Sequence, residues 1–316
     1  MIEVKNIVKK YGDKYAVNDI SFTVNSGEIV GFLGPNGAGK STTMNILTGY
    51  LSATSGDVKI DGMDILEEPT KAKKLIGFLP ELPPLYMDMT VKEYLDFVYD
   101  LKGCKFPRRP HIEEICELIK ITDVYNRMIK NLSKGYKQRV GFAQALIGNP
   151  PVLILDEPTV GLDPRQIIEI RNLVKKLGKT HTVILSTHIL QEVQSVCDRI
   201  IVINKGQLVA DGDADTLTYK VAGNRKLIAR ISGPKNDIVK TLRALDSVIY
   251  VDPLTSKEAG SFDYLVESQP NVDIRKMMFS VLAQKGWPLI GLRSMDMSLE
   301  DVFVQLITND TGEGVE

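Results

Sequence analysis

The chain has 316 residues and a formal net charge of −1, with 39 basic against 40 acidic side chains. This balance excludes a field of one sign over the whole molecule, so composition gives no indication of a nucleic-acid or acidic-lipid partner. The length exceeds that of one ordinary compact core, and we therefore expect two domains.

Other features of the sequence favour a protein of the cytoplasm. The three cysteines, Cys104, Cys116 and Cys197, show no Cys-x-x-Cys spacing, which argues against a disulfide framework and a zinc site. The N-terminus, MIEVKNIVKKYG, alternates as a strand does and lacks the basic start and apolar run of an export signal. No segment approaches the ~18 consecutive apolar residues that a membrane-spanning helix needs.

Residues 2–30 are expected to form two or three strands of an antiparallel β subdomain, with turns at Gly12-Asp13 and Ser26-Gly27. Tyr11 lies just before the first of these turns, where its ring could be exposed. Taken alone, it is most simply a tyrosine that packs within the strand. The alternative is a platform on which an adenine ring stacks.

The segment GPNGAGKST matches the pattern Gly-x4-Gly-Lys-Ser/Thr between an apolar run at 28–33 and a helical run at 43–48. A chance match in a glycine-rich turn is the alternative, and the flanking strand and helix disfavour it. Glycines let backbone amides close around phosphate oxygens, and the helix directs its free N–H groups toward them. Lys40 adds a cation, and Ser41 is left to ligate Mg²⁺. We therefore expect a nucleotide polyphosphate to be held by Gly34, Pro35, Asn36, Gly37, Ala38, Gly39, Lys40, Ser41 and Thr42.

A helical insertion is expected after the next part of the sheet. Two short strands, a charged helix over 69–74 and a buried strand over 75–80 come first. Prolines in the segment ELPPLY then forbid regular strand pairing, so the chain must leave the sheet as an irregular loop. From Leu85 to Lys130 apolar residues recur at helical spacing, which predicts an insertion of about residues 85–148 whose apolar positions are core.

The insertion ends in a segment, Asn131 to Gly148, that begins as a polar turn and continues as a helix with an apolar face. Ser133 in this turn is either a plain N-cap or a hydroxyl that, together with the helix N-terminus, meets an anion.

Two acids, Asp156 and Glu157, directly follow the apolar run Val152 to Leu155. Burying acids at the end of an apolar strand costs free energy, which is justified where a cation or a reaction requires them. A pair of acids that only caps a helix N-terminus is therefore the weaker alternative. Ligands bind at the carboxyl ends of parallel strands. We therefore expect Asp156 to hold Mg²⁺ through its water shell and Glu157 to deprotonate the attacking water. His188 ends another apolar strand near this edge, where it can touch a γ-phosphate, although a lone histidine is more often structural.

Up to about residue 215 these segments, in their order, resemble the ATP-binding subunit of an ABC transporter. The matching motifs are Tyr11 as the adenine platform, GPNGAGKST as Walker A, LSKGY at 132–136 as the signature, VLILDE at 152–157 as Walker B, GLD at 161–163 as the D-loop, and His188 as the switch histidine. The resemblance implies an α/β fold with a P-loop NTPase core, an antiparallel β subdomain and the helical insertion, within an ATP-binding domain of residues 1–220.

The resemblance also implies ATP and Mg²⁺ as cofactors. Lys40, Glu157 and His188 would be catalytic, and Ser41 and Asp156 would hold the metal. Further nucleotide contacts would come from Tyr11, the Walker A loop, Glu81, Ser133, Gly135 and Asp163, with Ser133 and Gly135 facing the ATP of a neighbouring subunit.

Two motifs depart from the family pattern. The signature is usually LSGGQ, and here Lys134 and Tyr136 replace a glycine and the glutamine, whereas Ser133 and Gly135 remain. Glu81 stands where the family has a glutamine that senses Mg²⁺ and the membrane partner. A carboxylate there would either ligate more strongly or add repulsion near ATP.

The C-terminal segment, residues 224–316, is expected to be a small accessory α+β domain. A helix-like stretch at 214–221 leads into it, and the following elements are expected in the order β-α-β-β-α-β of a ferredoxin-like unit, before a final helix at 298–308. The sequence of this segment shows no catalytic spacing.

The leading functional hypothesis is an ATP-hydrolysing energy-coupling subunit that powers export through a separate membrane permease. It would be cytoplasmic, peripheral on the inner face of the cell membrane, and would pair on ATP binding with a second ATP-binding subunit, most simply its own copy, with no nucleic-acid partner. The loop 81–90, with exposed Leu82, Leu85 and Tyr86, would dock on the permease.

Two alternatives remain from other classes. One is a soluble ABC-type ATPase acting on a ribosome or nucleic acid. The single P-loop and the lack of a heptad tract or a basic stripe disfavour it. The other is a small-molecule kinase, which leaves LSKGY and His188 unexplained.

Overall fold

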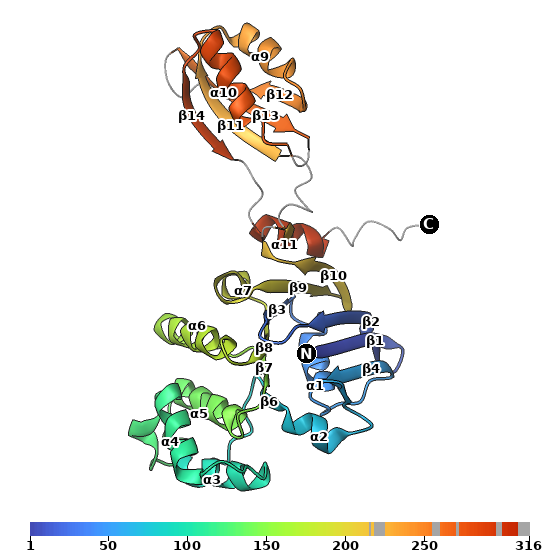
Figure 1. Cartoon of the computed structure of the whole chain (residues 1–316), viewed down its shortest axis with the longest axis vertical. Helices are drawn as coiled ribbons and strands as arrows, with labels where there is room; N and C mark the ends of the chain where they lie inside the picture. Colours follow the sequence, from blue (N-terminus) through green and yellow to red (C-terminus); the bar gives the residue numbers. More distant parts are fainter. Residues whose placement is uncertain (215, 218–224, 255–259, 270–271, 295–298, 309–316) are drawn as a thin grey trace. The chain divides into compact units, whose positions relative to one another are not determined.

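The computed structural model describes residues 1–214, 216–217, 225–254, 260–269, 272–294 and 299–308. Contacts divide the chain into two compact units, Met1–Ala214 and Asp215–Glu316, and each is described by itself (Figure 1). The expected domain boundary at 220–224 and most of the expected helix at 214–221 lie outside the described residues.

The centre of the N-terminal unit is a six-stranded sheet in the order β10-β9-β3-β8-β7-β6. Strands β9 to β6 of this order pair in parallel, and β10 pairs antiparallel to β9. The strands β3, β7 and β8 are buried along their whole length, as their apolar runs predict for a covered parallel sheet. Their bounds are β3 (Ile29–Leu33), β6 (Ile76–Leu79), β7 (Val152–Asp156), β8 (Thr182–Thr187), β9 (Arg199–Asn204) and β10 (Gln207–Gly212).

The N-terminal hairpin belongs to a second sheet, antiparallel and four-stranded, in the order β2-β1-β4-β5. These strands are β1 (Ile2–Tyr11), β2 (Lys14–Val24), β4 (Ser55–Ile60) and β5 (Met63–Asp64). The two sheets share one hydrophobic core, in which the ring centroids of Phe22 and Phe32 are 5.6 Å apart. The predicted antiparallel subdomain is therefore a separate layer packed on the parallel sheet.

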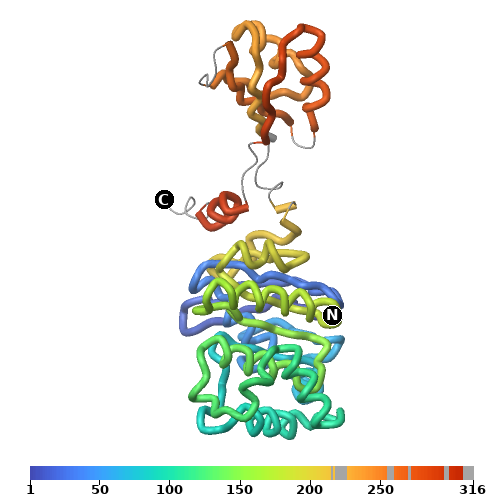
Figure 2. The backbone as a smooth tube through the Cα atoms, turned by 90° about the vertical axis from the view of Figure 1, so that its left-hand side faces the viewer, coloured from blue at the N-terminus to red at the C-terminus, as the bar shows by residue number. Residues whose placement is uncertain are grey.

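The predicted helical insertion is present as α3 (Val91–Leu101), α4 (Arg108–Ile119), two short 3₁₀ turns and α5 (Lys134–Leu146). Both views show α3, α4 and α5 gathered into one group at one end of the N-terminal unit (Figures 1 and 2). Thr90 and Glu93 form a capping box that begins α3. The apolar positions of these helices are core, as expected from their spacing. The remaining helices of the unit include α1 (Lys40–Leu47), α2 (Pro69–Lys74), α6 (Pro164–Gly178) and α7 (Leu190–Val196).

The C-terminal end of α5 is tied to both α3 and β6. The Lys102 Nζ atom donates hydrogen bonds to the carbonyl oxygens of Gln144, Ala145 and Ile147, at 2.7, 3.2 and 3.0 Å. Burial lowers the pKa of the Lys102 ammonium to about 8. The side-chain amide of Gln144 donates to the carbonyl of Phe78 in β6 at 2.7 Å. The three bonds from Lys102 satisfy carbonyls that the end of α5 leaves without partners.

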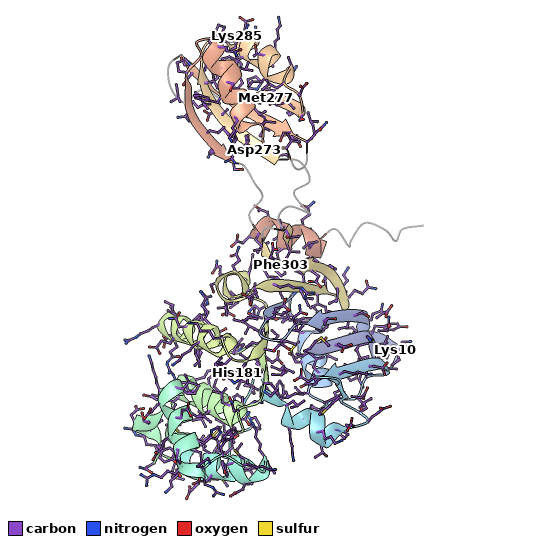
Figure 3. The ribbon with its side chains drawn as sticks, viewed as in Figure 1. Lys10, His181, Asp273, Met277, Lys285 and Phe303 are labelled. Atoms are coloured by element: carbon purple, nitrogen blue, oxygen red, sulfur yellow. The ribbon has the colours of Figure 1, made fainter. Side chains whose placement is uncertain are left out.

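The C-terminal unit contains the six elements predicted for it, in the predicted order. They are β11 (Arg225–Ser232), α9 (Lys235–Arg243), β12 (Val248–Pro253), β13 (Ser261–Ser268), α10 (Arg275–Gln284) and β14 (Leu289–Ser294), followed by α11 (Leu299–Thr308). The strands form one antiparallel sheet in the order β12-β13-β11-β14. In Figure 3, Asp273 and Lys285 mark the two ends of α10. Among the described residues, no helix is both long and apolar enough to span a membrane.

Candidate active site

The phosphate-binding loop lies between β3 and α1, as its motif requires. Gly37 and Gly39 have φ angles of 79° and 108°, which side chains disfavour. A Cβ atom at Gly39 would also lie 2.5 Å from the carbonyl oxygen of Ala16. Helix α1 begins after Gly39 with no side-chain cap, so its first N–H groups stay available to an anion.

Lys40 points back along this loop. Its Nζ atom donates hydrogen bonds to the carbonyl oxygens of Gly34 at 2.9 Å and Pro35 at 3.2 Å, and the residue is 6% exposed. The same nitrogen is 3.3 Å from Glu157 Oε1. The loop and the end of β7 therefore meet at this cation.

A cavity of about 370 Å³ opens beside the loop and contains many of the predicted site residues. Asn36, Gly37, Gly39, Lys40, Ser41, Thr42, Glu81, Glu157 and His188 all line it. Glu81 also lines a neighbouring cavity of about 680 Å³ that extends toward Lys102. Its position therefore connects the nucleotide site with the start of the helical insertion.

Asp156 and Ser41 supply the hard oxygen atoms of the site. The Ser186 hydroxyl donates to Asp156 Oδ1, and the Ser41 side chain is hydrogen-bonded to the same carboxyl. Burial raises the pKa of the Asp156 carboxyl, against these two hydrogen bonds, which lower it. A buried carboxylate beside a hydroxyl is a donor set that suits Mg²⁺, so both residues fit the predicted metal site.

Glu157 is held in an unusual backbone conformation with φ 46°. Its N–H group donates to the backbone carbonyl and the hydroxyl oxygen of Ser186, at 3.1 and 3.2 Å. A non-glycine residue in this region costs about 1–3 kcal/mol and persists only where its surroundings enforce it. The carboxylate contacts His188 Nδ1 at 2.9 Å, so the predicted base lies between Lys40 and the predicted switch histidine.

The signature segment lies on the D-loop of its own chain. Ser133 is the N-cap of α5, and its Oγ accepts the N–H of Tyr136 at 3.4 Å. A Cβ atom at Gly135 would lie 2.6 Å from the Gln166 side chain, which forms a capping box with Asp163 at the start of α6. A Cβ atom at Gly161 would overlap the ammonium of Lys134. In the described part of the chain, neither Ser133 nor Gly135 lines the nucleotide cavity.

Tyr11 lies at the end of β1 and is 56% exposed. The Lys9 ammonium is 5.5 Å from its ring centroid. The cavity beside the loop is lined by Ala16 of β2 and, within the described residues, not by Tyr11. The ring predicted to stack on adenine is thus available at the surface, and its role stays a prediction.

Some residues of the site were not anticipated from the sequence. Ser186 and Thr187 end the buried strand β8, and polar residues in that position are the signal that identified Asp156. Glu192 is an acid on the buried side of α7, where an apolar residue would be expected. By contrast His181, labelled in Figure 3, is structural, because its ring contacts the Leu177 carbonyl at 3.0 Å and Asn149 at 3.2 Å.

Comparison with known proteins identifies the family. A family model described as "ABC transporter" matches residues 17–160. The "Linearmycin resistance ATP-binding protein LnrL" of Bacillus subtilis (strain 168) is 34% identical over 318 residues, 97% of this chain and 98% of that protein. The "Nod factor export ATP-binding protein I" of Burkholderia orbicola (strain AU 1054) is 32% identical over 96% of each chain.

A solved structure supports the same conclusion for the N-terminal unit. It is described as the "Dimeric structure of a post-hydrolysis state of the ATP-binding cassette MJ0796 bound to ADP and Pi". Its TM-score is 0.63 at 30% sequence identity, covering 67% of this chain and 98% of that one. The predicted P-loop NTPase fold of the N-terminal unit and the resemblance to ATP-binding subunits are therefore confirmed, and the chain belongs to the ABC transporter ATP-binding family and is an ABC ATPase.

Proposed function

We propose that this ABC ATPase powers export through a separate membrane permease. One observation carries the mechanism. Lys40, Glu157 and His188 meet at the carboxyl ends of β3, β7 and β8, where bound ATP would present its γ-phosphate.

Each group at this edge has a separate task. The loop amides and Lys40 bind the β and γ oxygens of ATP and stabilise the charge that develops on them. Glu157 orients a water and accepts its proton as the water oxygen attacks the γ-phosphorus. The bond to the bridging β–γ oxygen breaks, which leaves ADP and phosphate. His188 holds Glu157 through the 2.9 Å contact and reaches the γ-phosphate. Mg²⁺, when bound by Ser41 and Asp156, neutralises charge on the phosphates.

The second half of each site comes from another copy of the chain in this proposal. Ser133 and Gly135 do not line the cavity of their own subunit, as far as the structure describes it, so they are free to face the ATP of a partner. Asp163 and Lys134 lie beside them and would also approach the partner. The dimeric state of the solved relative, a cassette bound to ADP and phosphate, supports this arrangement.

Export and attachment to the membrane are supported by the relatives and by the surface. The two relatives named above match this chain along nearly its whole length, and their names describe resistance and export. Leu82 is 79% exposed and Tyr86 is 53% exposed in the loop 81–90, which is the docking surface we propose for the permease. The subunit would then sit on the inner face of the membrane. No observation favours a ribosome or nucleic acid as partner.

Domain roles follow the two compact units. We assign ATP binding to residues 1–220, with the insertion at about 85–148, and an accessory role to residues 224–316. The accessory domain has its own core, in which Leu227 and Ile231 of β11 pack with Ile238 and Met278 of the helices.

Gel filtration of Glu157→Gln with and without Mg-ATP tests the shared site. The variant keeps the side-chain shape but removes the base, so hydrolysis should fall by about 10²–10⁴ and a nucleotide-dependent dimer should accumulate. Ser133→Arg in the same background should prevent that dimer, whereas Lys92→Ala, on an exposed position of α3, should not. Hydrolysis by Glu157→Gln at the wild-type rate would show that Glu157 is not the catalytic base. If the Glu157→Gln dimer still forms when Ser133→Arg is added, the signature segment is not part of the shared nucleotide site.

Copurification tests the permease. Affinity isolation of the full chain from detergent-solubilised membranes should bring down an integral-membrane protein, and Leu82→Glu should release it. Recovery of ribosomal proteins instead would favour the alternative function.

A further inference from the structure

Glu192 is a buried carboxylate with two hydroxyl donors. It lies in the first turn of α7 and is 1% exposed. The Thr159 hydroxyl donates to Oε1 at 2.5 Å, and the Thr187 hydroxyl donates to Oε2 at 2.8 Å. The Arg171 guanidinium is 4.0 Å away, and its Nε atom is buried with no hydrogen-bond partner among the described residues. An acid is almost never buried this deeply unless its oxygens are satisfied.

Both threonines belong to the turns that carry the catalytic side chains. Thr159 follows Glu157 by two residues, and the Val160 N–H donates to the Glu157 carbonyl at 3.2 Å to close that turn. Thr187 directly precedes His188. Because the Thr187 hydroxyl gives its proton to Glu192, its oxygen is free to accept the N–H of Ile189 at 3.1 Å, which fixes the turn around His188.

The regular strand pairing of the sheet stops before these two turns. The parallel pairing of β7 with β8 ends at Asp156 and Ser186, one residue before Glu157 and two before His188. Beyond that point a backbone hydrogen bond, from the Glu157 N–H to the Ser186 carbonyl at 3.1 Å, still connects the segment after β7 with the end of β8. Glu192 connects the two turns again, with one carboxylate oxygen bonded to each, and within the described residues it does not line the nucleotide cavity.

We propose that Glu192 is a positioning residue for ATP hydrolysis. Its carboxylate fixes the distance between the turn of Glu157 and the turn of His188, so that the imidazole remains against the base. It acts through Thr159 and Thr187 and touches neither ATP nor water. Loss of this link lets the two turns separate, and a shift of about 1 Å in a reacting group is enough to cost on the order of 10²-fold in rate.

The first test compares substitutions of Glu192 with a control on the same helix. Glu192→Ala should lower kcat by about ten- to a hundred-fold and leave KM for ATP within about two-fold, because the phosphate-binding loop is unchanged. Glu192→Gln should retain most of kcat, since an amide keeps both contacts when one threonine hydroxyl becomes the acceptor. Gln194→Ala, at an exposed position of α7, should match the wild type. Thermal unfolding and binding of a fluorescent ATP analogue are measured on every variant.

The second test removes the hydroxyls and does not depend on the folding of Glu192→Ala. Thr187→Val and Thr159→Val keep the side-chain shape, and each should lower kcat by about ten-fold without weakening ATP binding. In the Glu192→Ala background Thr187→Val should have no further effect on kcat, because the link is already broken. A purely structural Glu192 would give a lower melting temperature with wild-type kcat, and that result overturns the proposal. Wild-type kcat in both threonine variants overturns it equally.

Discussion

Lys40 and Glu157 form a buried ion pair, with 3.3 Å between Nζ and Oε1. The ammonium predicted to bind phosphate is therefore paired with the predicted base. ATP entering the loop brings a γ-phosphate that competes with Glu157 for this ammonium. In the proposed mechanism, binding would exchange one anion for another at Lys40 and would free the Glu157 carboxylate to accept a proton from water. Nucleotide binding and activation of the base would then be one event.

Lys40→Ala should abolish ATP hydrolysis and also destabilise the folded chain. The phosphates lose their main side-chain counterion, and Glu157 is left buried without a partner cation, a loss of about 3–5 kcal/mol for a buried pair. Chemical denaturation and ATP-binding titrations measure the two effects. Lys40→Ala combined with Glu157→Gln should regain stability but no activity. Wild-type hydrolysis in Lys40→Ala would exclude the loop from the mechanism.

Asp156→Asn should make the nucleotide-free protein more stable, by roughly 1 kcal/mol at pH 7, while hydrolysis with Mg²⁺ is lost. Burial raises the pKa of this carboxyl in the folded state, so the folded wild type loses stability as pH rises from about 4 through the raised pKa. The advantage of the variant should be complete at neutral pH and shrink toward pH 4. Urea denaturation at several pH values measures it, with Asp57→Asn on the exposed face of β4 as the control. A variant less stable than wild type at pH 7 contradicts this account.

Gly135→Ala should lower ATP hydrolysis by about ten-fold with little change in ATP affinity. The added methyl group would meet Nε2, Cδ and Oε1 of Gln166 at 2.6–2.7 Å, which pushes the start of α5 away from α6. Gln166→Ala makes room for the methyl group, and the double variant should recover part of the lost rate. Steady-state kinetics of the single and double variants check this. No recovery would mean that something other than Gln166 requires the glycine.

Leu82→Glu should weaken permease binding and leave the ATPase activity of the isolated subunit unchanged. Leu82 is almost fully exposed, whereas Leu85, predicted to be exposed with it, is half-buried against the core of the helical insertion. The prediction for Leu85 was wrong because the loop folds back after Pro84 and brings that side chain onto the insertion. Leu66→Glu, on an equally apolar but separate exposed position, is the matched control in a pull-down. Equal loss of binding in both variants contradicts a specific docking loop.

The parts of the fold and site that the sequence predicts are those with a local cause. Helix α2 has the bounds that its initial proline and its lysine-rich end predict. Strand β7 ends in an acidic residue, which the sequence explains because ligands bind at the carboxyl ends of parallel strands. The contacts of Glu192 and Lys102 could not be predicted. The contacts of Glu192 with Thr159 and of Lys102 with the end of α5 join residues 33 to 45 positions apart. The contact of Glu192 with Thr187 crosses a turn whose geometry depends on the packed sheet.

The ties at the C-terminal end of α5 have a mechanical consequence. Helix α5 has 13 residues and is therefore about 20 Å long. One end carries Ser133, and the other is fastened by Lys102 and Gln144 to α3 and to the strand that enters the loop 81–90. If α5 moves as a rigid unit, a push on that loop would displace Ser133 without unfolding of the insertion. Force applied to the loop 81–90 would thus move the surface that carries Ser133.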